Sequence, residues 1–110
     1  HVVIHYRSSA AAAEALAARL PSAETLAFDL ADDRAALAAV TAVAARLPFW
    51  RCLVNSASVF DYDGVTMLDP ATNRAAMQIN ALAPAALAQG FIAQATGPAP
   101  RTVIHVTDMK

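Results

Sequence analysis

Polar side chains follow four apolar stretches of this 110-residue sequence. Each stretch has the length and composition of a short strand, and the polar residues begin where it ends. They supply guanidinium, hydroxyl, amide and carboxylate groups, which bind phosphates, sugar hydroxyls and small polar substrates. The four polar segments are Arg7-Ser8-Ser9, Asp29-Leu30, Asn55-Ser56-Ala57-Ser58 and Thr107-Asp108.

The elements that position these segments alternate between strand and helix. We expect strands over residues 2–6, 25–28, 52–55 and 102–106. The first helix begins after Ser8 or Ser9, whose hydroxyls can cap it. We expect later helices to be capped by Asp32 or Asp33, and by Asp69 with Pro70 in the first turn, the last helix running to about Gln94.

Strands joined by helices are parallel, and strands buried on both faces have continuous apolar runs like these. The sequence therefore predicts an α/β fold with a doubly wound parallel sheet. In the second helix Leu37, Val40, Val43 or Ala44, and Leu47 recur at helical spacing, which predicts a buried stripe. In an open parallel sheet ligands bind beyond the carboxyl ends of the strands, where the four polar segments lie.

Composition narrows the possible partners. The net charge is −1 and no basic run is interleaved with aromatics, so we expect no nucleic-acid binding. No apolar stretch approaches the roughly 20 residues of a membrane span. The start of the chain has no charged segment leading into an apolar one, so we expect no secretory signal and a cytoplasmic location. We expect no metal site, and a buried thiol at Cys52.

Arg7 indicates which ligand the first segment binds. In a dinucleotide-binding fold, an acidic side chain near this strand end binds the ribose 2′-hydroxyl, whereas an arginine accommodates a 2′-phosphate. Arg7 with Ser8 therefore favours NADP(H), if the ligand is a dinucleotide. The alternative is a solvated charge at Arg7 and a helix cap at Ser8.

Pro84 predicts a kink in the last helix. Proline has no N–H, so Pro84 cannot donate to the carbonyl of Asn80, four residues earlier. We expect that carbonyl to be available to another partner such as water. The alternative is a polar residue that is merely tolerated at a kink.

The pattern as a whole resembles the short-chain dehydrogenase/reductase family. The resemblance is carried by VVIHYRSS, AFDL, LVNSAS with MQINALAP, and RTVIHVTD, in the family order and at the family spacing. LVNSAS is similar to the family's Asn-Asn-Ala-Gly segment, with Ser56 for the second Asn and Ser58 for the Gly. On this resemblance residues 1–110 are part of a single NADP(H)-binding Rossmann-type domain, covering about its second to fifth strands.

Two details resemble the pteridine reductases and their dihydromonapterin/dihydrofolate reductase relatives. One is Ser58 followed two residues later by Phe60, the position of an aromatic that stacks on the pterin ring. The other is Asp108, which stands where most members of the family have a catalytic Ser. Alternatives from the sequence alone are a Phe60 folded onto its own loop and an Asp108 that caps a following element.

The resemblance also implies roles for other residues. Asp29 corresponds to an acidic residue that contacts the adenine amino group, with a simple role in its own turn as the alternative. The cofactor-binding residues that line the adenosine and nicotinamide path would be Asp29, Leu30, Asn55, Ala57 and Ser58. Asn55 corresponds to an Asn that ties neighbouring strands together, and Asn80 to the Asn whose carbonyl holds a water of the proton relay. The family's Gly-rich loop would precede residue 1, and its Tyr-x-x-x-Lys pair would follow residue 110.

The function expected from this resemblance is that of an NADPH-dependent reductase of a pterin or dihydrofolate-type substrate. The alternatives are a generic carbonyl reductase, similar to 3-oxoacyl carrier-protein reductases, and a non-catalytic NADP(H)-binding protein. Members of the family are commonly tetramers, so we expect a homotetramer or homodimer paired through the long, alanine-rich helix.

Overall fold

Strands and helices alternate along the chain in the predicted order. A computed structural model describes residues 1–47, 49–61, 64 and 66–107. The elements are β1 (Val2–Tyr6), α1 (Ala10–Ala17), β2 (Ala23–Ala27), α2 (Asp33–Arg46), β3 (Cys52–Asn55), α3 (Pro70–Met77), the π-helical turn η1 (Gln78–Leu82), α4 (Ala83–Gln94) and β4 (Thr102–His105).

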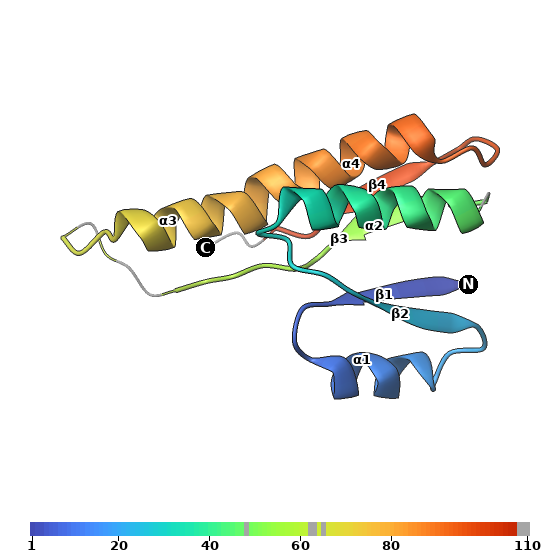
Figure 1. The fold of residues 1–110 in the computed structure, drawn as a ribbon, viewed down its shortest axis with the longest axis horizontal. Coiled ribbons are helices and arrows are strands. Elements are labelled where there is room, and N and C mark those ends of the chain that lie inside the picture. The colour runs from blue at the N-terminus through green and yellow to red at the C-terminus, as the bar shows by residue number, and fades with distance from the viewer. Residues whose placement is uncertain (48, 62–63, 65, 108–110) are drawn as a thin grey trace.

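The four strands form two separate parallel pairs. β1 pairs with β2 from Val2 opposite Ala23 to Tyr6 opposite Ala27. β3 pairs with β4 from Cys52 opposite Thr102 to Asn55 opposite His105. The predicted α/β class with parallel strands is confirmed, as part of a Rossmann-type domain. Among the described residues, however, no strand joins the two pairs into one sheet, and they lie apart in Figure 1.

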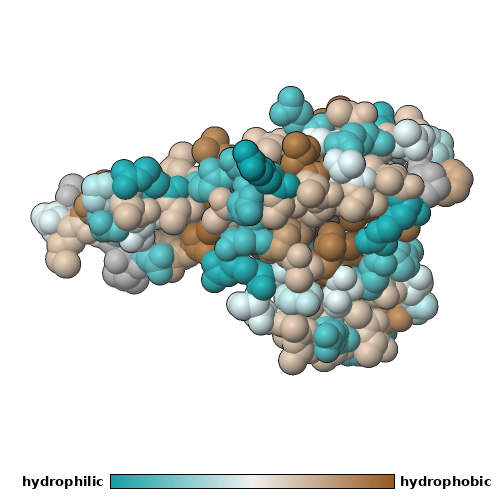
Figure 2. Space-filling model, viewed as in Figure 1, coloured by the Kyte–Doolittle hydropathy of each residue, from teal (hydrophilic) through white to brown (hydrophobic). Residues whose placement is uncertain are grey.

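A groove of about 990 Å³ separates the two pairs of strands. β1 and β3 form its two sides, and Val40, Val43 and Leu87 from the helices contribute to its apolar lining. Figure 2 shows hydrophobic surface in the crevice between the helices and the lobe formed by β1, α1 and β2. Cys52 also lines this groove and is exposed, so the prediction of a buried thiol is wrong. The reason is that, within the described part of the chain, β3 has a neighbouring strand on one side only.

Helices α2 and α4 pack against each other over β3 and β4. α2 contributes Ala36, Ala39, Val40 and Val43 to the core, and Phe91 of α4 is fully buried with its ring 4.8 Å from that of Trp50. Leu37 was predicted to be buried but is 56% exposed. Small side chains on the buried face allow the helices to approach closely, and this face excludes Leu37.

The sequence predicts a side-chain cap at three helix starts, and the structure has two of these caps. Asp32 caps α2, its Oδ1 accepting from the N–H groups of Arg34 at 2.9 Å and Ala35 at 3.1 Å. Asp69 caps α3 by accepting from the N–H of Thr72 at 2.8 Å, and this bond lowers the pKa of the carboxyl. Ser9 precedes α1 but makes no capping bond through its side chain.

The predicted kink is present as the π-helical turn η1. The N–H of Ala83 bonds the carbonyl of Gln78, five residues earlier, in place of the usual four. Pro84 follows directly and cannot donate to Asn80, which accounts for the break in the α-helical ladder at this place. No helix in the described part of the chain is long and apolar enough to cross a membrane.

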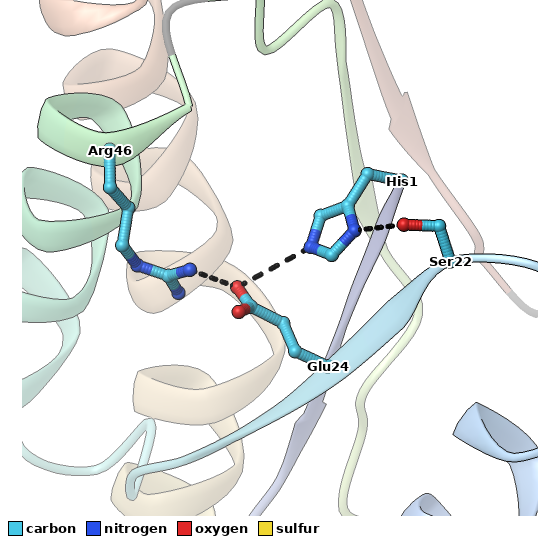
Figure 3. Close-up of polar contacts among 4 residues, drawn as sticks. All are labelled: His1, Ser22, Glu24 and Arg46. Atoms are coloured by element: carbon cyan, nitrogen blue, oxygen red, sulfur yellow. Dashed lines mark hydrogen bonds and ion pairs between the residues drawn. The ribbon is translucent and has the colours of Figure 1, made fainter.

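A cluster of polar side chains connects β2 with the end of α2. Figure 3 shows Arg46 of α2 paired with the Oε1 atom of Glu24 on β2. His1 lies beside them, with its Nδ1 2.6 Å from the hydroxyl of Ser22 and its Nε2 3.8 Å from Glu24. These contacts join the lobe of β1, α1 and β2 to the helical layer.

Candidate functional site

The carboxyl ends of β1, β2 and β3 meet around a second cavity, of about 310 Å³. Three loops form its walls, and one residue of η1 completes the lining. The lining residues are His5, Tyr6, Arg7, Ser8, Ser9, Asp29, Leu30, Ala57, Ser58, Val59 and Ile79. Segments far apart in the sequence are therefore brought together at the edge where a parallel sheet places its ligand.

The first wall follows β1. Arg7 and Ser8 are exposed and leave their guanidinium and hydroxyl groups accessible at the cavity. The N–H of Phe28 donates to the carbonyl of Tyr6 at 3.3 Å, and this bond keeps the ends of β1 and β2 adjacent. His5 contributes a second link, with its Nε2 2.9 Å from the carbonyl of Phe28.

The second wall follows β2 and carries a carboxylate. Asp29 Oδ1 accepts from the N–H of Ala31 at 2.9 Å, and the Asp29 carbonyl accepts from the N–H of Asp32 at 3.1 Å. The loop is thus a tight turn that runs directly into the cap of α2. Leu30 is buried in the core below the turn and contributes an apolar surface to the cavity.

The third wall is the segment Ala57-Ser58-Val59 after β3. Asn80 fixes this segment through a reciprocal pair of hydrogen bonds. Its Nδ2 donates to the Val59 carbonyl at 2.7 Å, and the Val59 N–H donates to its Oδ1 at 2.9 Å. The side chain of Asn80 therefore holds the wall, whereas the sequence pointed to its main-chain carbonyl. The role of that carbonyl stays a prediction.

Asn55 lies below the site and ties elements together. It is buried, and its Nδ2 lies 3.3 Å from the Pro84 carbonyl and 3.3 Å from His105 Nδ1. The amide thus links β3 to α4 and to the neighbouring strand β4. Asn55 lines the large groove and not the smaller cavity, so the structure places it in a supporting position.

Two further candidates are Phe60 and Asp108. Phe60 is 70% exposed and lines neither the cavity nor the groove. Asp108 lies outside the described residues. The described residues thus assemble the cavity at the ends of β1, β2 and β3, whereas the roles of Phe60 and Asp108 stay predictions.

Sequence reasoning missed several residues of the lining. Ile79 and Val59 are apolar and carry no chemical signal of their own, although each adjoins a residue that does. The sequence predicts His5 and Tyr6 as strand residues, and their position at the carboxyl end of β1 is a signal that could have identified them. In the described ranges no three side chains of the His, Cys, Asp and Glu types are grouped as a metal ion would require.

Comparison with known protein families identifies the fold family. A family model described as enoyl-(acyl carrier protein) reductase matches residues 1–108. The chain belongs to this family of short-chain dehydrogenases/reductases. Comparison with curated protein sequences gave no significant match.

Solved structures of short-chain dehydrogenases/reductases have the same arrangement. A variant of the enzyme from Serratia marcescens superposes with a TM-score of 0.85 at 22% identity, over 94% of this chain and 43% of that chain. FolM alternative dihydrofolate reductase 1 from Brucella canis, complexed with NADP, gives 0.85 at 27% identity, over 96% of this chain and 44% of that one. An enzyme from Burkholderia cenocepacia in complex with NADP gives 0.78 at 27%, over 84% and 39%.

This chain therefore spans less than half the length of these similar structures. Of the short-chain dehydrogenase/reductase fold, this chain contains the strands and helices that surround the cavity at the carboxyl ends of β1, β2 and β3. Activity, substrate and partners belong to the whole protein.

Proposed function

We propose that the protein containing this chain is an NADPH-dependent reductase of the short-chain dehydrogenase/reductase family. The observation that carries the proposal is the cavity at the carboxyl ends of β1, β2 and β3, with Arg7 and Ser8 on its first wall. Its volume of about 310 Å³ is sufficient for part of a small-molecule ligand, since such sites span roughly 300–1,000 Å³. The NADP complexes at 27% identity support the same cofactor.

The residues of the cavity suit the adenosine half of NADPH. The Arg7 guanidinium can donate two parallel hydrogen bonds to a 2′-phosphate, and Ser8 adds a neutral donor. Asp29 and Leu30 would hold the adenine, one through its carboxylate and the other through apolar contact. On the third wall, Ala57 and Ser58 would border the path toward the nicotinamide.

NADPH, when bound, supplies a hydride to the substrate. In this chain, Asn80 would hold a water of the proton relay through its carbonyl while its side chain fixes Val59. Asp108 would assist proton delivery together with residues of the protein beyond this chain.

We propose a pterin or dihydrofolate-type compound as the substrate. Support comes from Ser58 and Phe60 in the loop after β3, from Asp108, and from the similarity to the Brucella canis alternative dihydrofolate reductase. Phe60 presents an exposed aromatic surface on which a flat ring can stack. Homodimer or homotetramer formation and a cytoplasmic location are part of the same proposal. The exposed apolar side chains of Leu82 and Ile92 on the long helix are available for pairing.

A second candidate function is reduction of an enoyl thioester or a 3-oxoacyl thioester. The description of the matching family, enoyl-(acyl carrier protein) reductase, favours it directly. Such an enzyme would use the same cofactor cavity, so the two candidates differ only in the substrate that receives the hydride.

The test is to follow NADPH oxidation by the full-length protein with several acceptors in parallel. The acceptors are dihydrobiopterin, dihydromonapterin, dihydrofolate, an acetoacetyl thioester and a crotonyl thioester. Turnover of a pterin or dihydrofolate but of neither thioester is the expected result. Turnover of a thioester alone would replace the pterin proposal by the second candidate. NADPH binding without turnover of any acceptor would indicate a non-catalytic NADP(H)-binding protein.

A further inference from the structure

The π-helical turn η1 contacts two different walls of the cavity through residues that are close in sequence. Ile79 is buried and lines the cavity. The residues on either side of it, Gln78 and Asn80, are two positions apart, so their side chains leave the helix in nearly opposite directions. Each of them bonds a different loop.

Gln78 reaches the wall that follows β2. Its Nε2 donates to Asp33 Oδ1 at 2.6 Å, in the first turn of α2. Asp33 adjoins the capping residue Asp32, whose N–H is bonded to the Asp29 carbonyl. The hydrogen bond of Gln78 therefore fixes the start of α2, and through it the turn that places Asp29 and Leu30 at the cavity.

Asn80 reaches the wall that follows β3. Its two hydrogen bonds occupy both the backbone N–H and the backbone carbonyl of Val59. Neither Gln78 nor Asn80 lines the cavity itself. Their side chains therefore act on binding in this cavity by holding other residues in place.

We propose that η1 holds two walls of the cavity at a fixed separation. Gln78 positions the wall that follows β2, and Asn80 positions the wall that follows β3. The proposal assigns to Gln78 a positioning role in cofactor binding. It rests on the proposed function for the identity of the ligand, but not for the mechanical link between η1 and the two loops.

The experiment compares single substitutions in the full-length protein by hydrogen exchange and by binding of 2′,5′-ADP, which represents the adenosine half of the cofactor. Gln78→Met keeps the length of the side chain and removes the amide. We expect faster exchange in residues 29–35 and no change in residues 56–60. Asn80→Leu should give the reverse pattern, because each residue bonds one wall only.

Binding gives a second measurement. Gln78→Met should raise the Kd for 2′,5′-ADP by about two- to tenfold, since an exposed side-chain hydrogen bond makes a modest net contribution. Gln78→Met should raise the KM for NADPH more than it lowers kcat. Gln78→Lys restores a donor to Asp33, and Gln78→Glu combined with Asp33→Asn exchanges donor and acceptor, so both should recover most of the affinity.

Gln89→Met is the matched control, because Gln89 is an exposed glutamine of α4 outside the cavity lining. If Gln78→Met matches this control both in hydrogen exchange and in the Kd for 2′,5′-ADP, the positioning role of Gln78 is refuted. If the unsubstituted protein binds neither 2′,5′-ADP nor NADPH, the proposed cofactor is refuted, while the exchange pattern of residues 29–35 and 56–60 still decides the role of η1.

Discussion

At the residue scale, Arg7 and Asp29 are charged residues of the cavity walls, and they differ in their hydrogen bonding. Asp29 is engaged with the N–H of Ala31 in its own turn, so its carboxylate shapes the loop as well as the cavity. Arg7 is exposed on the wall that follows β1 and is positioned by the end of that strand. The cofactor preference of the whole protein should therefore depend most strongly on Arg7.

Replacement of Arg7 tests this preference. Arg7→Gln in the full-length protein should lower the ratio of kcat/KM for NADPH to that for NADH by about tenfold or more, because a hydrogen bond to a charged group contributes about 1.5–3 kcal/mol. Arg19→Gln is the control, since Arg19 is an exposed arginine beyond α1 and outside the cavity lining. An unchanged ratio in Arg7→Gln would mean that the 2′-phosphate is bound elsewhere or not at all.

At the element scale, the close approach of α2 and α4 depends on Gly90. A Cβ atom at this position would lie 3.0 Å from Val40 Cγ1, which is closer than normal packing. Alanine is favoured over glycine in a helix by about 1 kcal/mol, whereas overpacking a core costs about 1–3 kcal/mol. Because Val40 is itself buried, it cannot move away freely, and the packing effect should win.

Gly90→Ala should therefore destabilise the protein by about 1 kcal/mol in urea unfolding. In a Val40→Ala background the same substitution should become stabilising, because the contact is gone and the helix preference of alanine remains. Gly64→Ala serves as control, since no described residue apart from its neighbours in the chain lies within 4 Å of a Cβ atom there. If Gly90→Ala has the same sign in both backgrounds, the contact with Val40 does not limit the packing.

Asp69 gives a prediction about pH at the start of α3. The N–H and hydroxyl of Thr72 bond its carboxylate and lower its pKa. A carboxyl whose pKa is lower in the folded state stabilises the fold above its unfolded pKa, and this contribution is lost as the pH falls through the folded value. The stability difference between the unsubstituted protein and Asp69→Ala should thus be constant near neutrality and shrink below about pH 4.

Urea unfolding at a series of pH values measures this difference. Asp61→Ala, at an exposed loop position, is the comparison for a general charge effect. A difference for Asp69→Ala that stays the same down to pH 3 would show that the charged form of the cap makes no special contribution.

At the scale of the whole molecule, β1 and β3 border the groove and are not paired with each other in the described part of the chain. Val2 and Tyr6 bond toward β2, and Arg51 and Asn55 bond toward β4. Alternate residues of a parallel strand direct their peptide groups to opposite sides. The N–H groups of the intervening residues therefore point into the groove, and these are Val3 and His5 on one side and Cys52 and Val54 on the other.

We expect a further parallel strand of the whole protein to fill this groove and join the two pairs into one sheet. Amide exchange at Val3, His5, Cys52 and Val54 should then be slow in the whole protein and fast in the 110-residue chain alone, with Leu53 and Ile4 as internal references that bond within their own pair in both. Equally fast exchange at the four positions in both proteins would contradict a filled groove.

The sequence by itself determined the order of the elements, the cap at Asp69, a cap at either Asp32 or Asp33, and the break in the long helix before Pro84. These features depend on local physics: the period of apolar residues, the oxygen acceptor at a helix start and the absence of an N–H in proline. It also indicated that Arg7 and Asp29 would share one edge, because parallel strands align their carboxyl ends.

Only the tertiary structure decided how those elements pack. It placed Leu37 outside and Cys52 at an open groove, and it directed the side chain of Asn80 to Val59, 21 residues away. Such outcomes depend on which partner lies opposite a residue, and a one-dimensional pattern does not contain that information. Helix spacing gives the period of an apolar stripe, but the space between α2 and α4 selects which residues fill it.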